Sequence, residues 1–117
     1  MSNTEMTFGE FFDLLLETRF PDCHSWLNVL RCRLPPALWE SHCKMGLTPE
    51  SAEYLGNDIS GQISRQLKDG EPLARRQEIL ATGRAFFLAI HNMLEKQGVS
   101  VPMEVIDQIE VPPDLEE

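Results

Sequence analysis

Two pairs of adjacent side chains in this sequence, Cys23-His24 and His42-Cys43, are of types that bind metals or act as nucleophiles. Two cysteines and two histidines can hold a zinc ion, and a cysteine beside a histidine can form a nucleophile–base pair. Neighbouring residues of a helix point about 100° apart, so the two members of a pair do not readily face one ion. The sequence also lacks the C-x₂-C spacing of common zinc sites. We therefore expect buried thiols and half-exposed imidazoles here, with no metal, no cofactor and no catalytic residue.

Three carboxylates, Glu50, Glu53 and Asp58, lie within one predicted helix. Paired acids can carry out acid–base chemistry or bind calcium. No D-x-[DN]-x-[DN]-G loop is present, and acids are common on the solvated faces of helices. We expect these three side chains to belong to such a face.

The basic residues are too few for a nucleic-acid ligand. Arg75, Arg76 and Arg84 form the one cluster, within a segment 65–96 of six basic and four acidic residues. The whole 117-residue chain carries a formal charge of −9. Nucleic acids and anionic lipids both require a cationic surface, so neither is expected as the main partner.

The sequence has the character of a reduced, cytoplasmic protein. Its three cysteines (Cys23, Cys32 and Cys43) are odd in number and irregularly spaced, which predicts free and mostly buried thiols. The first residues, 1–5, lack the basic start of a signal peptide. The longest apolar stretch, 79–94, is shorter than the roughly 20 residues of a membrane helix.

Apolar spacing and helix boundary signals predict an all-α fold, a compact bundle of about five helices with one long helix in the C-terminal half. Apolar residues recur at intervals of three and four, and no sustained period-two alternation competes. Capping residues, prolines and glycines set the boundaries. The expected helices run from a Thr7 cap to Phe20-Pro21, from an Asp22 cap to Pro35-Pro36, over about 36–45 with Gly46 as a left-handed stop, from a Thr48 cap to Gly70, and from Pro72 to Gln97 with Gly98 as terminator.

The C-terminal part of the chain is ambiguous. Pro102 can start a short helix, but the valines and isoleucines that follow also suit an extended arm. We expect residues 1–111 to form a single helical domain and 112–117 to form an acidic, disordered tail. Residues 99–117 hold six acidic and no basic side chains, so they serve either solubility or docking onto a basic surface. Interleaved apolar residues favour docking, and the nearest surface is the protein's own.

Glycines inside the fourth helix and apolar residues around the fifth indicate close neighbours. Gly56 and Gly61 predict a kink or the close approach of another segment. The fifth helix is apolar on more than one side, with a smooth row of Ala81, Ala85 and Ala89. Such a helix is either central to its own bundle or shared with a homodimer interface. The candidate dimer residues are Leu80, Phe86, Phe87, Ile90 and Leu94.

The whole chain resembles the QslA-type quorum-sensing antiactivators. The resemblance extends from Met6-Thr7-Phe8-Gly9-Glu10-Phe11-Phe12 through Thr48-Pro49-Glu50 to Arg84-Ala85-Phe86-Phe87, together with the size and acidity. It implies a helical homodimer that binds the ligand-binding domain of a LuxR-type transcription regulator. It further implies that this regulator is kept from dimerising and hence from binding DNA.

Exposed aromatic residues are the candidates for contact with such a partner, because aromatic anchors concentrate binding energy. The alternative for each of them is a place in the core. A second possible function is that of a small acidic secretion chaperone that masks a hydrophobic segment of an effector. A third is an enzyme with a cysteine or metal site. The candidate partner-binding residues are Phe8, Phe11, Phe12, Trp26 and Trp39.

Overall fold

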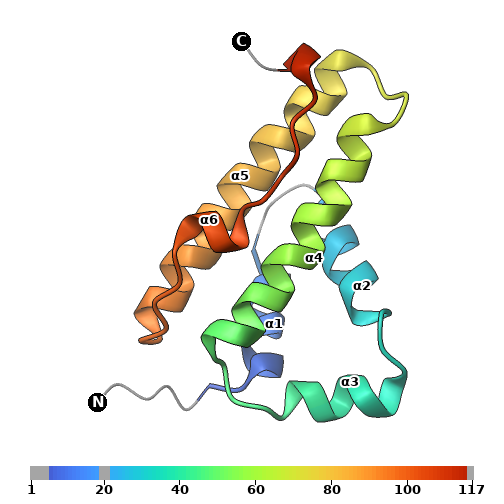
Figure 1. The fold of residues 1–117 in the computed structure, drawn as a ribbon. Coiled ribbons are helices and arrows are strands. Elements are labelled where there is room, and N and C mark those ends of the chain that lie inside the picture. The colour runs from blue at the N-terminus through green and yellow to red at the C-terminus, as the bar shows by residue number, and fades with distance from the viewer. Residues whose placement is uncertain (1–5, 19–21, 116–117) are drawn as a thin grey trace.

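Two long helices joined by a short turn form the frame of the molecule, and the remaining helices pack against them (Figure 1). The computed structural model describes residues 6–18 and 22–115. The fold is all-α, as the sequence predicts, and the long helix in the C-terminal half is confirmed. The elements are α1 (Phe8–Leu16), α2 (Cys23–Arg31), α3 (Pro36–Cys43), α4 (Pro49–Lys68), α5 (Leu73–Lys96), α6 (Met103–Ile106) and the 3₁₀ helix η1 (Pro113–Leu115).

Three of the predicted boundary signals operate as expected. The Thr7 hydroxyl accepts from the Glu10 amide at 3.1 Å while the Glu10 carboxylate accepts from the Thr7 amide at 2.9 Å, which closes a capping box. Thr48 caps α4 in the same way, with Ser51 in the place of the glutamate. Gly98 follows α5 in the left-handed region, at φ 79°. These local bonds fix where α1, α4 and α5 begin or end.

Asp22 precedes α2 as predicted, but its side chain does not cap the helix. One carboxylate oxygen instead accepts a hydrogen bond from Arg75 at the start of α5, at 2.9 Å. The Asp22 backbone is left-handed, at φ 72°. Local spacing predicted that the Asp22 carboxylate would cap α2. The carboxylate instead pairs with an arginine of a distant helix.

Of two other predicted stops, one differs from the structure and one lies outside the described residues. Gly46 is not a left-handed terminator, because φ is not positive there, and it forms an isolated antiparallel bridge with Thr7. The first helix ends at Leu16, and the predicted stop at 20–21 lies outside the described residues. The bridge at Gly46 instead joins the end of the α3 segment to the start of α1.

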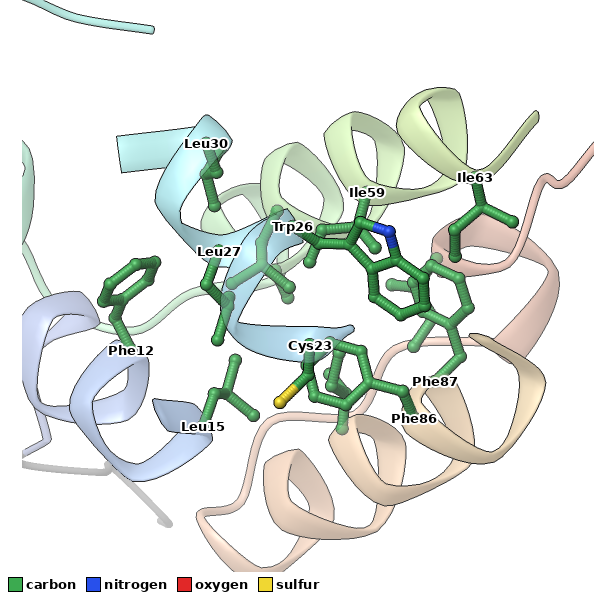
Figure 2. Close-up of a cluster of buried hydrophobic side chains, with 14 of the residues drawn as sticks. Phe12, Leu15, Cys23, Trp26, Leu27, Leu30, Ile59, Ile63, Phe86 and Phe87 are labelled. Atoms are coloured by element: carbon green, nitrogen blue, oxygen red, sulfur yellow. The ribbon is translucent and has the colours of Figure 1, made fainter. Parts of the chain in front are cut away.

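The core lies where α2 crosses the two long helices (Figure 2). Trp26 of α2 is fully buried, and its ring centroid lies 6.0 Å from that of Phe86 on α5. Its indole N–H donates to Gln66 of α4 at 3.0 Å, and Gln62 donates to its backbone oxygen at 2.8 Å. The largest core side chain is thus satisfied at its polar atom as well as packed on its faces.

The five side chains proposed for a dimer interface all lie in the core of a single chain. Four are fully buried and Leu80 is 7% exposed, so these residues are not available to a second copy in this conformation. The second apolar side of α5 is covered by α6 and η1, which both contact it. The outer face of α5 keeps the exposed residues Ala81, Ala85 and Leu88.

The C-terminal segment is both a helix and an arm. The four residues of α6 are followed by an extended stretch that runs along α4 and α5 to η1 (Figure 1). Leu115 is 8% exposed, so the described part of the expected disordered tail packs on the body; residues 116–117 lie outside the described residues. Within 6–18 and 22–115, no helix has the length and apolar character needed to span a membrane.

Candidate protein-docking surface

Helix α3 stands apart from the bundle, at one end of the molecule (Figure 1). None of its residues is buried, because its apolar side chains do not fall on one face. Two backbone hydrogen bonds join the segment after its C-terminal end to the start of α1. They run from the Phe8 amide to the Met45 oxygen at 2.8 Å and from the Leu47 amide to the Met6 oxygen at 3.2 Å. The helix is therefore anchored to α1 at this end.

An aromatic cluster joins α3 to α1 and α4. Trp39 presents its ring edgewise to Phe8 and Phe12, with centroid distances of 5.9 and 5.0 Å. The His42 ring lies 4.4 Å from Phe8 and 5.3 Å from Tyr54, again edge to face. Such geometry is favourable for aromatic pairs and fixes the orientation of α3.

His42 is the polar member of this cluster. Its Nε2 atom is buried without a hydrogen-bond partner. Burial lowers the pKa of the ring below its ordinary value of 6.5, because the charged form loses hydration among apolar neighbours. The neutral ring is therefore the form that fits between the aromatic side chains.

Between the end of α2 and the inner side of α3 lies a hollow of about 840 Å³. Most of its lining is apolar, with the Trp39 ring among the walls and charged groups from Arg31 and Glu40 beside them. An apolar hollow with a few polar groups is the usual form of a binding site. Its lining residues are Arg31, Cys32, Leu34, Pro36, Ala37, Trp39, Glu40 and Cys43.

Of the two thiols in this hollow, Cys43 is not an activated nucleophile. The pKa of Cys43 is raised by burial and by the nearby charges of Asp13 and Glu40, which keeps the thiol protonated. Cys32 is exposed, in contrast to the prediction of mostly buried thiols, and Cys23 alone is fully buried. In the described part of the chain, no group of three or more His, Cys, Asp or Glu residues is arranged to hold a metal ion.

Large apolar side chains around α3 remain in contact with solvent. Leu38 is 57% exposed and Met45 is 58% exposed. Val29, on the neighbouring α2, is exposed as well. The chain leaves these apolar side chains uncovered, although none of them lines the hollow itself.

Of the five aromatic residues proposed for partner contact, only Trp39 lines the hollow. Phe8, Phe11, Phe12 and Trp26 are buried in the core. The sequence interpretation did not include Leu34, Pro36 and Ala37 among the candidates, although they line the hollow. The available signal was the lack of a single apolar face in the segment after Pro35-Pro36, since a helix without such a face cannot bury itself well.

One of the three acidic residues singled out in the sequence forms an ion pair within the fold. Asp58 accepts a hydrogen bond from Arg33 at 2.8 Å, while Glu50 and Glu53 are exposed. This outcome fits a solvated helix face with one ion pair.

Two arginines of the basic cluster bond three acidic partners. Arg75 bonds Asp22 and Glu78, and Arg76 bonds Asp114 of the C-terminal segment. Arg84 is exposed, so the three side chains do not act as one patch.

The arrangement around α3 is suited to bind apolar side chains of another molecule. A hollow next to a tethered helix can receive a side chain or one face of a helix, and Trp39 supplies a rigid wall. No protein-family model, curated protein or solved structure matches this chain.

Proposed function

We propose that this protein is a non-enzymatic inhibitor that binds a LuxR-type quorum-sensing transcription regulator and prevents the regulator from dimerising and binding DNA. The observation that carries the proposal is the apolar hollow beside α3, with Trp39 in its wall. A regulator that dimerises through helices has an apolar helical face, and an apolar hollow of this kind can receive the side chains of such a face. Occupation of the face would exclude the second regulator subunit.

The charge of the chain supports the same choice of partner. A formal charge of −9 disfavours contact with DNA itself and favours contact with proteins that carry a basic DNA-binding surface. Long-range attraction of this kind raises the association rate at low ionic strength. The apolar hollow then supplies the short-range contact.

The experiment is a binding titration with two matched variants. Ala37 and Ala74 are both exposed, and each is the second residue of a helix that begins directly after a proline. Ala37→Arg places a long charged side chain in the hollow, whereas Ala74→Arg adds the same charge at the distant start of α5. We expect Ala37→Arg to weaken binding of the purified regulator at least about 30-fold, equivalent to about 2 kcal/mol.

The control, Ala74→Arg, should bind as the unmodified chain does. Equal affinity of both variants would show that the hollow is not the contact surface. Absence of binding by the unmodified chain, together with capture of a secreted effector, would favour the secretion-chaperone function instead.

A further inference from the structure

Two rings attach the second half of α3 to the bundle. Trp39 packs edgewise on Phe8 and Phe12, and His42 contacts Phe8 of α1 and Tyr54 of α4 at centroid distances of 4.4 and 5.3 Å. No residue of α3 is buried, although the helix lies against α1 (Figure 1). Its attachment therefore depends strongly on these two rings.

One nitrogen of the His42 ring has no hydrogen-bond partner in the docked helix. The Nε2 atom is buried, and no donor or acceptor of the described residues bonds it. A neutral imidazole can carry its proton on Nδ1 and leave Nε2 without one, whereas an imidazolium carries a proton on both nitrogens. The protonated ring would thus hold a buried, charged N–H group without an acceptor, which is costly. The docked helix fits the neutral ring only.

Acidic groups on α1 and α3 lie in this neighbourhood but do not supply the missing acceptor. Asp13 of α1 and Glu40 of α3 are near enough to raise the pKa of Cys43, the residue after His42. Glu10 of α1 accepts from the Thr7 amide in the helix cap. The pKa of the His42 ring is nevertheless lowered, and burial is the cause. The loss of hydration therefore outweighs the attraction of the carboxylates.

The α4 side presents a phenol and an ion pair. Burial raises the pKa of Tyr54, with the charge of Asp58 adding to the effect and Arg33 opposing it, so the phenol is neutral in neutral and acidic solution. The Asp58 carboxylate is already bonded to Arg33 at 2.8 Å. Glu50 and Glu53 are exposed. None of these groups bonds the buried imidazole nitrogen.

Movement of α3 would remove one side of the hollow. Five of the eight lining residues, all within 36–43, belong to this helix. The helix is joined to α2 and α4 by the segments 32–35 and 44–48, which lie outside the helices. The position of α3 and the existence of the hollow are therefore linked.

We propose that protonation of His42 releases α3 from α1 and α4, and that the hollow beside α3 is lost when the helix leaves. The neutral ring fits the docked helix, whereas the charged ring gains water at Nε2 once the helix has moved away. This release is a property of the chain alone. Its consequence, weaker partner binding in acid, rests on the proposed function.

Hydrogen exchange of the unmodified protein, followed by mass spectrometry, tests the release. Peptides from 36–45 report on α3 and peptides from 73–96 report on α5, at pH 8 and at pH 5, with the intrinsic exchange rate at each pH taken into account. Above pH 6.5 the ring is neutral in both the docked and the released helix, so the protection of α3 is constant. Below pH 6.5 the released ring binds a proton that the docked ring does not, so protection falls.

We expect the protection of α3 to fall at least about threefold between pH 8 and pH 5. The upper limit is about 30-fold, set by an ordinary pKa of about 6.5 for the ring of the released helix. Because the rest of the bundle stays folded, α5 should remain at least about tenfold more protected than α3 at both pH values. Equal protection of α3 at the two pH values, or equal protection of α3 and α5, would overturn the proposal.

Two matched variants assign the effect to one ring. His42→Phe keeps an aromatic ring and removes the titrating group, so the fall in α3 protection should disappear. His24 is exposed on α2, and His24→Phe should leave the fall unchanged. An undiminished fall in His42→Phe would also overturn the proposal. No partner is present in these measurements, so their outcome is separate from that of the proposed function.

Discussion

Gly56 and Ile106 touch where α4 crosses α6 at the start of the C-terminal arm, and a Cβ on Gly56 would lie 2.7 Å from the Ile106 Cβ and 2.9 Å from its carbonyl oxygen. Because the backbone of the arm cannot yield as a flexible side chain can, Gly56→Ala should force the arm away from the helix. We expect the free energy of unfolding to fall by about 1–3 kcal/mol, measured by urea denaturation.

Gly61, five residues further along the same helix, provides the control. The nearest atom to an added Cβ there is a guanidinium nitrogen of Arg65, at 3.7 Å. Gly61→Ala should therefore raise the free energy of unfolding by up to about 1 kcal/mol, through helix propensity alone. Equal effects of the two substitutions would contradict the close contact at Gly56.

Phe87 and its neighbour Leu88 distinguish core from surface on α5. Phe87 is fully buried and Leu88 is 54% exposed. Phe87→Arg would bury an unpaired charge, at a cost comparable to the whole stability of a small domain, so we expect a chain without a cooperative thermal transition. Leu88→Arg should keep the helical circular dichroism spectrum and shift the midpoint by only a few degrees. A folded, monomeric Phe87→Arg protein would instead point to an interface at Phe87.

His42 should make stability depend on pH. Burial holds the pKa of its ring below 6.5 in the folded protein. Above pH 6.5 the ring is neutral in both states, and its contribution to stability is fully present. As the pH falls below 6.5, the unfolded chain binds a proton that the folded chain does not, so the free energy of unfolding decreases until the folded ring also titrates.

The variant His42→Phe isolates this contribution, because it keeps an aromatic ring and removes the titrating group. Urea midpoints between pH 8 and pH 5 are compared for the two proteins. We expect a smaller decrease in the variant. Parallel curves would rule out a buried, neutral imidazole as a source of the pH dependence.

The three thiols should differ in reactivity. Cys32 is exposed, whereas Cys43 is half-buried and its pKa is raised by burial and nearby carboxylates. We expect Cys32 to react with a thiol-specific chromogenic reagent at least about tenfold faster than Cys43, since the thiolate is the reacting form. Buried Cys23 should react only after unfolding. Single serine variants assign each phase, and a fast phase that survives Cys32→Ser would contradict this order.

Local signals in the sequence predict much of the helical framework. Thr7, Thr48 and Gly98 act within a few residues of their own positions, so their effects can be inferred without knowledge of the fold. A kink or the close approach of another segment was predicted for Gly56 and Gly61 alike, because a glycine inside a helix costs stability. The structure brings a segment close at Gly56 and not at Gly61. The identity of that neighbour, Ile106, depends on the path of the arm and could not be inferred.

Non-local contacts explain the predictions that the structure did not follow. The cap expected from Asp22 gives way to an ion pair with Arg75, which lies 53 residues away in sequence. The second apolar side of α5 suggested either a central position in the bundle or a dimer interface, and α6 and η1 of the same chain cover it. The spacing of apolar residues indicates that a helix has two faces to bury, but it does not indicate which segment covers each face.

The candidate site was predicted only in part for the same reason. Phe12 lies on the apolar face of α1 and Trp39 lies in a helix without a single apolar face, but this difference in spacing does not show which segment covers each side chain. Phe12 lies beneath α3, while Trp39 belongs to α3 itself, the helix that the bundle leaves uncovered. Exposure therefore follows from the position of the helix and not from the residue type.

The most direct test of the proposed function is the association state of the regulator in the presence of this chain. The ligand-bound LuxR-type regulator is studied by sedimentation velocity with and without an excess of the protein. We expect the regulator dimer to disappear and to be replaced by a complex that contains a single regulator subunit, with loss of operator binding. A regulator that remains dimeric and bound to its operator at saturating concentrations of the protein would contradict the proposed function.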